Sequence, residues 1–199
     1  MSAALTGWDR RRQLLLTEYE QVGLDLFAER GYRDVTIDDI ADAAGVSTRT
    51  LYRYFPTKEE ILLAFPRRGL TIALETIAAL PPSDDPLRTA WTRLRKTFWD
   101  IDADVEQMNL WRRAATDAPE VAARIRGERL EAMLDALSGY VSRCLGVDPS
   151  TDVRPRLYAG VLAGVDVALV EMWGRSAFPT RPEIYAKAEQ AIVTLMGRR

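Results

Sequence analysis

The sequence contains no histidine and only one cysteine among its 199 residues. Without histidine there is no Ser-His-Asp triad, no imidazole base and no histidine-ligated zinc, and no spacing places two acids on one apolar helix face. Cys144 cannot form an internal disulfide, and its helical, apolar setting favours a core thiol over a redox sensor. We therefore expect a protein that is not an enzyme, with no catalytic residue, no metal site and no cofactor.

Long hydrophobic runs are also missing. The longest apolar stretch, Leu157 to Val170, is shorter than a membrane-spanning helix and contains Asp166. The first residues, MSAALTGWDRRRQ, lack the apolar region of a signal peptide. With 47% hydrophobic and 28% charged residues, the composition is that of a soluble globular protein. We expect a cytoplasmic protein of one or two small domains with no membrane partner.

Apolar residues recur at helical spacing along the whole chain, and no stretch alternates with the period of two that marks a β-strand. The pattern predicts an all-α fold. A short helix is expected after the capping box of Thr57 and Glu60, with an interruption at Pro66. Longer helices are expected at about 10–30, 87–102, 105–116, 119–144, 152–173 and 182–196.

The segment from Thr36 to Lys58, TIDDIADAAGVSTRTLYRYFPTK, predicts two short helices separated by a tight turn. Thr36 is placed to cap the first helix and Ser47 the second, while Gly45 suits the left-handed conformation that ends a helix. The residues expected to face inward and to fix the crossing of the two helices are Ile40, Ala41, Val46, Leu51 and Phe55. This is the pattern of a helix-turn-helix that reads the DNA major groove.

The second helix of this pair carries the candidate DNA contacts. If Leu51 faces inward, a rotation of about 100° per residue places Arg49, Tyr52 and Arg53 on the outer side. We predict that bases are read by Thr48, Arg49 and Tyr52, because arginine pairs with guanine and a methyl group or aromatic ring can contact a thymine methyl. Contacts to the DNA backbone are predicted for Thr36, Ser47, Thr50, Tyr54 and Lys58.

The overall charge would by itself argue against a nucleic-acid partner, because the net charge is −2 and the pI is about 5.4. The placement of charge matters more, since no acid occurs between Ala43 and Lys58. The run from Arg10 to Arg12 has two interpretations: phosphate contacts at the DNA flank, or simply a basic start to the first helix.

The run LFAERGYRDVTIDDIADAAGVSTRTLYRYFPTKEEIL, Leu26 to Leu62, resembles the N-terminal domain of the TetR family of transcriptional regulators. The resemblance implies a three-helix DNA-binding domain at residues 1–65, followed by a helical effector-binding and dimerisation domain at 66–199. It also implies a homodimeric repressor that a small molecule releases from double-stranded operator DNA. Two-fold symmetry would then require a palindromic operator.

Two helices near the C-terminus are the candidates for the dimer interface, as in that family. The helix expected at 152–173 is apolar nearly all round, and its two glycines one turn apart would permit the close approach of another helix. The last helix shows apolar residues on one side. The interface is predicted to include Gly160, Gly164, Ile184, Ala188, Ile192 and Leu195.

A small-molecule pocket is mostly apolar, with a few polar groups. The candidates are Trp91, Phe98, Met108, Trp111, Arg112, Tyr140, Tyr158 and Asp166, although each taken alone also suits a core or solvated position. Asp166 needs a partner within its apolar helix, either an arginine of another helix or a cationic ligand. These residues predict a hydrophobic or amphipathic effector.

The segment from Asp104 to Trp173 is also similar, in helix layout and arginine positions, to the acyl-CoA-like-ligand-binding class of TetR-type regulators. A different function is still open from the sequence. The chain could be a helix-turn-helix regulator that responds to a protein partner, or an activator without a small-molecule inducer.

Overall fold

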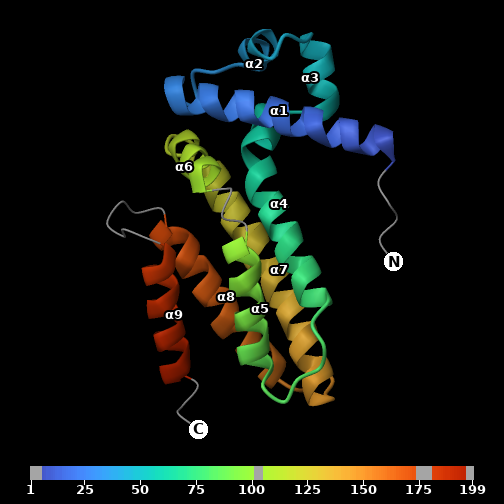
Figure 1. Cartoon of the computed structure of the whole chain (residues 1–199), viewed down its shortest axis with the longest axis vertical. Helices are drawn as coiled ribbons and strands as arrows, with labels where there is room; N and C mark the ends of the chain where they lie inside the picture. Colours follow the sequence, from blue (N-terminus) through green and yellow to red (C-terminus); the bar gives the residue numbers. More distant parts are fainter. Residues whose placement is uncertain (1–5, 101–104, 174–180, 196–199) are drawn as a thin grey trace. The chain divides into compact units, whose positions relative to one another are not determined.

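The computed structural model describes residues 6–100, 105–173 and 181–195, and within these ranges every regular element is an α-helix (Figure 1). The predicted all-α fold is confirmed. The helices of the described ranges are α1 (Gly7–Arg30), α2 (Ile37–Ala43), α3 (Thr48–Tyr54), α4 (Lys58–Ala78), α5 (Pro86–Asp100), α6 (Val105–Ala114), α7 (Pro119–Leu145), α8 (Arg154–Trp173) and α9 (Arg181–Leu195).

The chain divides into two compact units. Unit 1 comprises residues up to Arg68 together with Asp104–Ile125, so it contains α1 to α3, the first half of α4, α6 and the start of α7. Unit 2 comprises Gly69–Ala103 and the chain from Arg126 onward. The assignment of DNA binding to residues 1–65 and of effector binding to 66–199 concerns function and stays a prediction. The compact unit around the helix-turn-helix is larger than residues 1–65, because α6 packs against α1.

The core of unit 1 confirms the predicted inner face of the helix-turn-helix. Ile40, Ala41, Leu51 and Phe55 are buried, and Val46 packs against the same cluster. They meet apolar residues of α1, α4 and α6, chiefly Leu24, Phe27, Ile61, Leu62 and Leu110. The two short helices are therefore held by three longer ones, since helices of two turns are not stable alone.

Helix α4 corrects one prediction. Pro66 was expected to interrupt a short helix, but it lies inside a continuous helix of 21 residues. A proline has no backbone N–H, so the carbonyl of Leu62, four residues earlier, lacks its usual donor. Trp111 on α6 supplies the missing donor, because its indole Nε1 lies 2.7 Å from Leu62 O. A side chain distant in sequence thus allows α4 to continue through Pro66.

Unit 2 has its own core, in which α4, α5, α7, α8 and α9 contribute buried side chains. Its largest fully buried members are Ile77, Met133, Leu137 and Tyr140. None of the helices in the described ranges is both long and apolar enough to cross a membrane.

Candidate nucleic-acid interface

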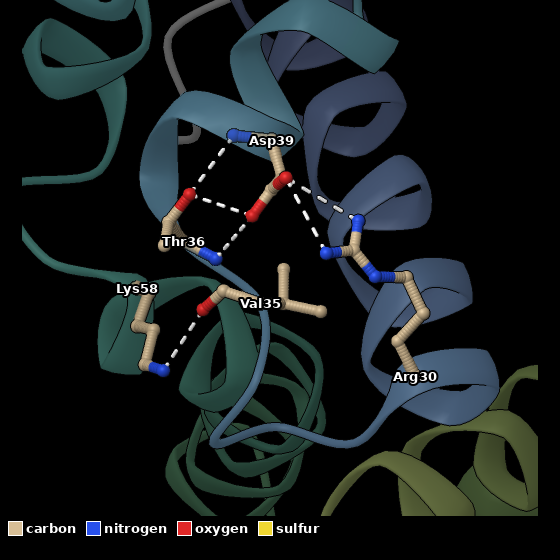
Figure 2. Close-up of polar contacts among 5 residues, drawn as sticks. All are labelled: Arg30, Val35, Thr36, Asp39 and Lys58. Carbon is tan, nitrogen blue, oxygen red and sulfur yellow. Dashed lines mark hydrogen bonds and ion pairs between the residues drawn. The ribbon is translucent and has the colours of Figure 1, made fainter.

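The start of α2 is fixed by a capping box. The hydroxyl of Thr36 accepts a hydrogen bond from Asp39 N at 3.1 Å, and the Asp39 carboxylate accepts from Thr36 N at 2.8 Å (Figure 2). Arg30, in the last turn of α1, donates to the other oxygen of Asp39 at 3.3 Å. These contacts, chiefly the two from Thr36, lower the pKa of Asp39. The first turn of α2 is therefore tied to the end of α1.

The turn between α2 and α3 depends on one glycine. Gly45 has φ +67°, a left-handed conformation that other residues rarely adopt, and Val46 N donates to Ala41 O at 2.9 Å. Ser47 caps α3 by accepting from Thr50 N at 3.2 Å. The hydroxyl of Thr48 donates to Asp38 on α2 at 2.6 Å. The position of α3 relative to α2 is thus set by both backbone and side-chain contacts.

The outer face of α3 carries the predicted base-reading residues. Arg49 is exposed and Tyr52 is 49% exposed, and within the described ranges Arg49 makes no ion pair. Thr48 is half-buried and its hydroxyl is used by Asp38, which leaves its methyl group for a base contact. The base-reading role of these three residues stays a prediction.

The residues predicted to contact the DNA backbone are placed in different ways. Ser47 is exposed, and its hydroxyl lies 2.9 Å from that of Thr50. The Thr36 hydroxyl is used in the capping box. Tyr54 is half-buried, with its ring edge-on to Tyr19 at 5.3 Å between centroids.

Lys58, the fifth of these residues, has a role that the sequence reasoning missed. Its ammonium donates to the carbonyl oxygens of Tyr32 at 2.7 Å and Val35 at 2.9 Å, and lies 3.4 Å from that of Arg33. Figure 2 shows it reaching from the start of α4 to Val35 O. The ammonium also lies 4.4 Å from the centroid of the Tyr32 ring. Since a lysine has three N–H donors, its capacity is used within the protein. A phosphate contact by Lys58 stays a prediction, and it would compete with these carbonyls.

Asp117 holds the same loop through its backbone amides. Its carboxylate accepts from the backbone amides of Tyr32 at 3.0 Å and Arg33 at 3.2 Å, and its carbonyl accepts from Arg33 Nε at 3.1 Å. Burial acts to raise the pKa of the Asp117 carboxyl, but the two amides and the Arg33 charge outweigh it, so the pKa is lowered. We call Lys58 and Asp117, with the loop of residues 31–35 between them, the loop clamp.

A buried carboxylate joins three helices of unit 1. The side chain of Glu20 on α1 is 2% exposed and forms a bidentate pair with Arg68 on α4, at 2.7 and 3.1 Å. Gln107 on α6 donates to the same carboxylate at 3.3 Å. From sequence alone, a single Glu in an amphipathic helix is expected to face solvent. Neither the contacts of Glu20 nor the loop clamp could therefore be predicted from neighbouring residues.

The predicted pocket residues fall into both compact units. In unit 1, Met108 is half-buried, Trp111 donates to Leu62 O, and Arg112 donates to Asn109 at 3.0 Å. Unit 2 contains Trp91 and Tyr140, which are buried, Tyr158, which is half-buried, and Asp166. The side chain of Phe98 lies outside the part of the structure that is described. The assignment of these residues to an effector pocket stays a prediction.

Asp166 has the arginine partner that was one of its two predicted alternatives. Arg129 on α7 binds it with two hydrogen bonds of 2.6 and 2.9 Å, and the two side chains are 12% and 14% exposed. A nearly buried carboxylate is thereby paired with the planar guanidinium that suits it best.

The predicted dimer residues are also placed unequally. Gly160 and Gly164 lie on the exposed side of α8, and Ala188 is half-buried. Ile192 is only 2% exposed and belongs to the core of unit 2, which removes it from the candidate surface. Helical periodicity identified its apolar face but not whether its own chain covers that face. The side chains of Ile184 and Leu195 lie outside the described residues.

Comparison with known proteins agrees with the helix-turn-helix. A family model described as bacterial regulatory proteins of the tetR family matches residues 21–65. The HTH-type transcriptional activator FasR of Mycolicibacterium smegmatis is 30% identical over 167 residues, which cover 83% of this chain and 72% of FasR. The mycofactocin biosynthesis transcriptional regulator MftR of Mycobacterium tuberculosis is 29% identical over 170 residues, covering 83% of each chain.

A solved structure extends the likeness to the whole fold. The TetR-family transcriptional regulator from Syntrophomonas wolfei superposes with a TM-score of 0.68 at 18% identity, covering 94% of this chain and 97% of that one. The shared helix-turn-helix and the identity to FasR settle the class of protein: the chain belongs to the tetR family of bacterial regulatory proteins and is a DNA-binding transcriptional regulator, not an enzyme.

Proposed function

We propose that this regulator is a homodimeric repressor that binds a palindromic operator through α3 and leaves it when a hydrophobic or amphipathic effector binds unit 2. The observation that carries the proposal is the outer face of α3. Arg49, Tyr52 and Arg53 are exposed there, on a helix held by the buried Leu51 and capped by Ser47. Such a protein acts in the cytoplasm, where bacterial operators are found.

The chemistry of this face suits a major groove. An arginine whose guanidinium has no acidic partner can bond O6 and N7 of guanine, and Tyr52 can pack against a thymine methyl. Ser47 and Thr50 offer hydroxyl donors to the phosphates beside the groove. The stiff connection between α2 and α3 supports specific readout, because a base-reading side chain must be held in a fixed place.

The exposed side of α8 supports a dimer. Leu157 is 59% exposed and Val161 37%, and they share this side with Gly160 and Gly164. Nothing lies within 4 Å of where a Cβ would be at either glycine, so a second helix could approach closely. An exposed apolar helix face of this kind suits coverage by a partner. A second copy would cover it by two-fold symmetry, and a symmetric dimer requires a palindromic site.

Tyr140 supports an effector site in unit 2. Its side chain is fully buried among apolar residues, and its hydroxyl makes no well-formed hydrogen bond within the described ranges, with the Cys144 thiol and the Thr89 hydroxyl as its polar neighbours. Burial, with the neighbouring Cys144 thiol adding to it, raises the pKa of Tyr140 to about 12, so the hydroxyl is neutral and can donate. A carbonyl or carboxylate oxygen on an otherwise apolar molecule would satisfy this donor.

The direction of control has a second candidate, because the relative FasR is named an activator. Here the same DNA contacts would recruit transcription instead of blocking it. A further alternative is that the effector is a protein partner instead of a small molecule, and the experiment that follows tests this too.

The test begins with selection of duplexes from a random-sequence library by the purified full-length protein. Recovery of a palindrome would support the proposed operator, and a complex containing two protein chains in sedimentation would support the dimer. Displacement by members of a panel of fatty acids and acyl thioesters would support the effector. In vitro transcription from a promoter that carries the selected site separates repression from activation. Recovery of no common sequence would contradict the proposal as a whole.

A further inference from the structure

The N-terminal half of α1 and the end of α3 enclose a hollow of about 420 Å³ on the surface of unit 1. Its lining consists of Trp8, Arg11, Arg12, Leu15, Arg53 and Tyr54. We call it the α1–α3 groove. In Figure 1, α3 lies over the N-terminal half of α1, drawn in dark blue. Two interpretations of the run from Arg10 to Arg12 were possible from the sequence. Neither predicted that Arg11 and Arg12 line a hollow together with α3.

The groove is strongly cationic. Three of its six lining residues are arginines and none is acidic. Across the described ranges, Arg11, Arg12 and Arg53 form no ion pair with any carboxylate. Arg12 and Arg53 instead lie near the ring of Tyr54, at 6.0 and 5.1 Å from its centroid. In a chain whose net charge is −2, three neighbouring arginines around one hollow suit an external anion, since the nearby Asp9, on which the Arg12 charge acts, is engaged in the capping box with Thr6.

The groove also has an uncovered aromatic wall. Trp8 is 73% exposed, the most exposed large apolar side chain in the described ranges. Helix α1 begins at a capping box of Thr6 and Asp9, which does not involve the Trp8 side chain. An exposed indole with a free N–H beside arginines suits a ligand that combines anionic oxygens with an apolar ring, such as the sugar-phosphate backbone.

Arg53 and Tyr54 make the groove continuous with the reading face of α3. We infer that the α1–α3 groove binds the operator backbone outside the bases that α3 reads, with Arg11 and Arg12 on phosphates and Trp8 on the neighbouring sugar. This inference rests on the proposed DNA-binding mode and adds a second contact surface to it. The site reads no sequence. It increases affinity for a half-site whose duplex extends past the major groove contacts.

Salt dependence measures phosphate contacts directly. Each lost contact lowers the slope of log affinity against log salt by about 0.9. In the proposed dimer the double substitution R11Q/R12Q removes two arginines from each half-site, so it should reduce the slope by about 2 to 4 on the selected operator with roughly one turn, about 10 base pairs, of flanking duplex. The matched control is R113Q/R126Q, which removes the same two charges from exposed positions on α6 and α7 and should keep the slope.

Trimming the flank tests the location of the contact. The wild-type protein should lose affinity and slope when the flanking duplex is cut back to the half-sites, whereas R11Q/R12Q should lose little more. The single substitution R10Q, on the same helix but outside the groove lining, should change the slope less than R11Q. W8A should weaken binding to the long duplex by about two- to tenfold without changing the slope, because an indole carries no charge.

The results separate the two proposals. If R49A abolishes preference for the selected sequence while R11Q/R12Q matches its control on every duplex, the proposed function stands and the groove does not bind DNA. Equal effects of R10Q and R11Q would assign the contact to the general charge of α1 and overturn the groove. If the wild type selects no sequence, both proposals fail. Thermal unfolding of each variant should match wild type, since all these side chains are exposed.

Discussion

Lys58 and Arg49 are two basic residues of the same helix-turn-helix region, and the structure uses them in opposite ways. The ammonium of Lys58 is engaged by loop carbonyls, whereas the guanidinium of Arg49 is exposed without an ion pair in the described ranges. Both were predicted to contact DNA. The difference is set by the backbone nearby: the loop of residues 31–35 has carbonyls and amides that no helix satisfies, and buried backbone groups need partners. A basic side chain close to such a loop therefore donates to the loop carbonyls before it is available to DNA.

The largest effect is expected for K58M, which keeps the apolar length of the side chain and removes the ammonium. The carbonyls of Tyr32 and Val35 lose a charged donor, so the free energy of unfolding should fall by about 2–3 kcal/mol. Urea unfolding followed by circular dichroism measures this. Unchanged stability with weaker operator binding would reverse the comparison and make Lys58 a DNA contact.

R49A is the counterpart on the reading face. Affinity for the selected operator should fall by about 1–3 kcal/mol, or about 5- to 150-fold, with no change in the free energy of unfolding. Binding to random DNA should change much less. An equal loss on both duplexes would reassign Arg49 from base reading to the phosphate backbone.

D117N tests the other half of the loop clamp at a smaller scale, since asparagine keeps one acceptor oxygen for the amides of Tyr32 and Arg33. We expect a loss of about 1 kcal/mol near neutral pH. Because the folded-state pKa of Asp117 is lowered, its contribution is complete above the ordinary aspartate pKa of about 3.9 and disappears as pH falls through the folded value. The stability difference between wild type and D117N should therefore shrink below pH 4. A difference that is constant down to acid unfolding would show that the charge is not involved.

Y140F should have the smallest effect on stability, within about 0.5 kcal/mol, because the buried hydroxyl that it removes makes no well-formed hydrogen bond in the described ranges. This substitution extends the comparison to unit 2, where the polar group is buried, unlike the exposed guanidinium of Arg49. If the hydroxyl serves an effector, the concentration of effector that releases the operator should rise about two- to tenfold. A clear loss of stability without any change in release would make Tyr140 purely structural.

Features encoded by neighbouring residues were predictable. Gly45 follows the end of α2 with positive φ, Thr36 and Asp39 form their capping box, and the inner face built around Leu51 is buried as expected. Each of these depends on residues a few positions apart, so a single sequence contains the whole signal.

Features that depend on distant partners were not predictable. Tyr32 and Asp117 are 85 positions apart, and Glu20 meets Arg68 across 48. Because a buried acid must have a partner, the sequence left two alternatives for Asp166, an arginine of another helix or a cationic ligand. Only the fold identifies the partner as Arg129. Ile192 shows the same limit, since an apolar helix face does not tell which surface covers it.

Because Trp111 donates to the carbonyl of Leu62, the effect of a substitution at position 111 depends on whether Pro66 has already been replaced. While Pro66 is present, loss of the indole leaves that carbonyl without a donor in the interior of α4. If Pro66 first becomes an alanine, a backbone amide returns, and position 111 is then freed from supplying that hydrogen bond. The need for a donor at position 111 is therefore set by a proline 45 positions away. A change from alanine to proline at position 66 could be accepted only in a chain that already had a side-chain donor at position 111.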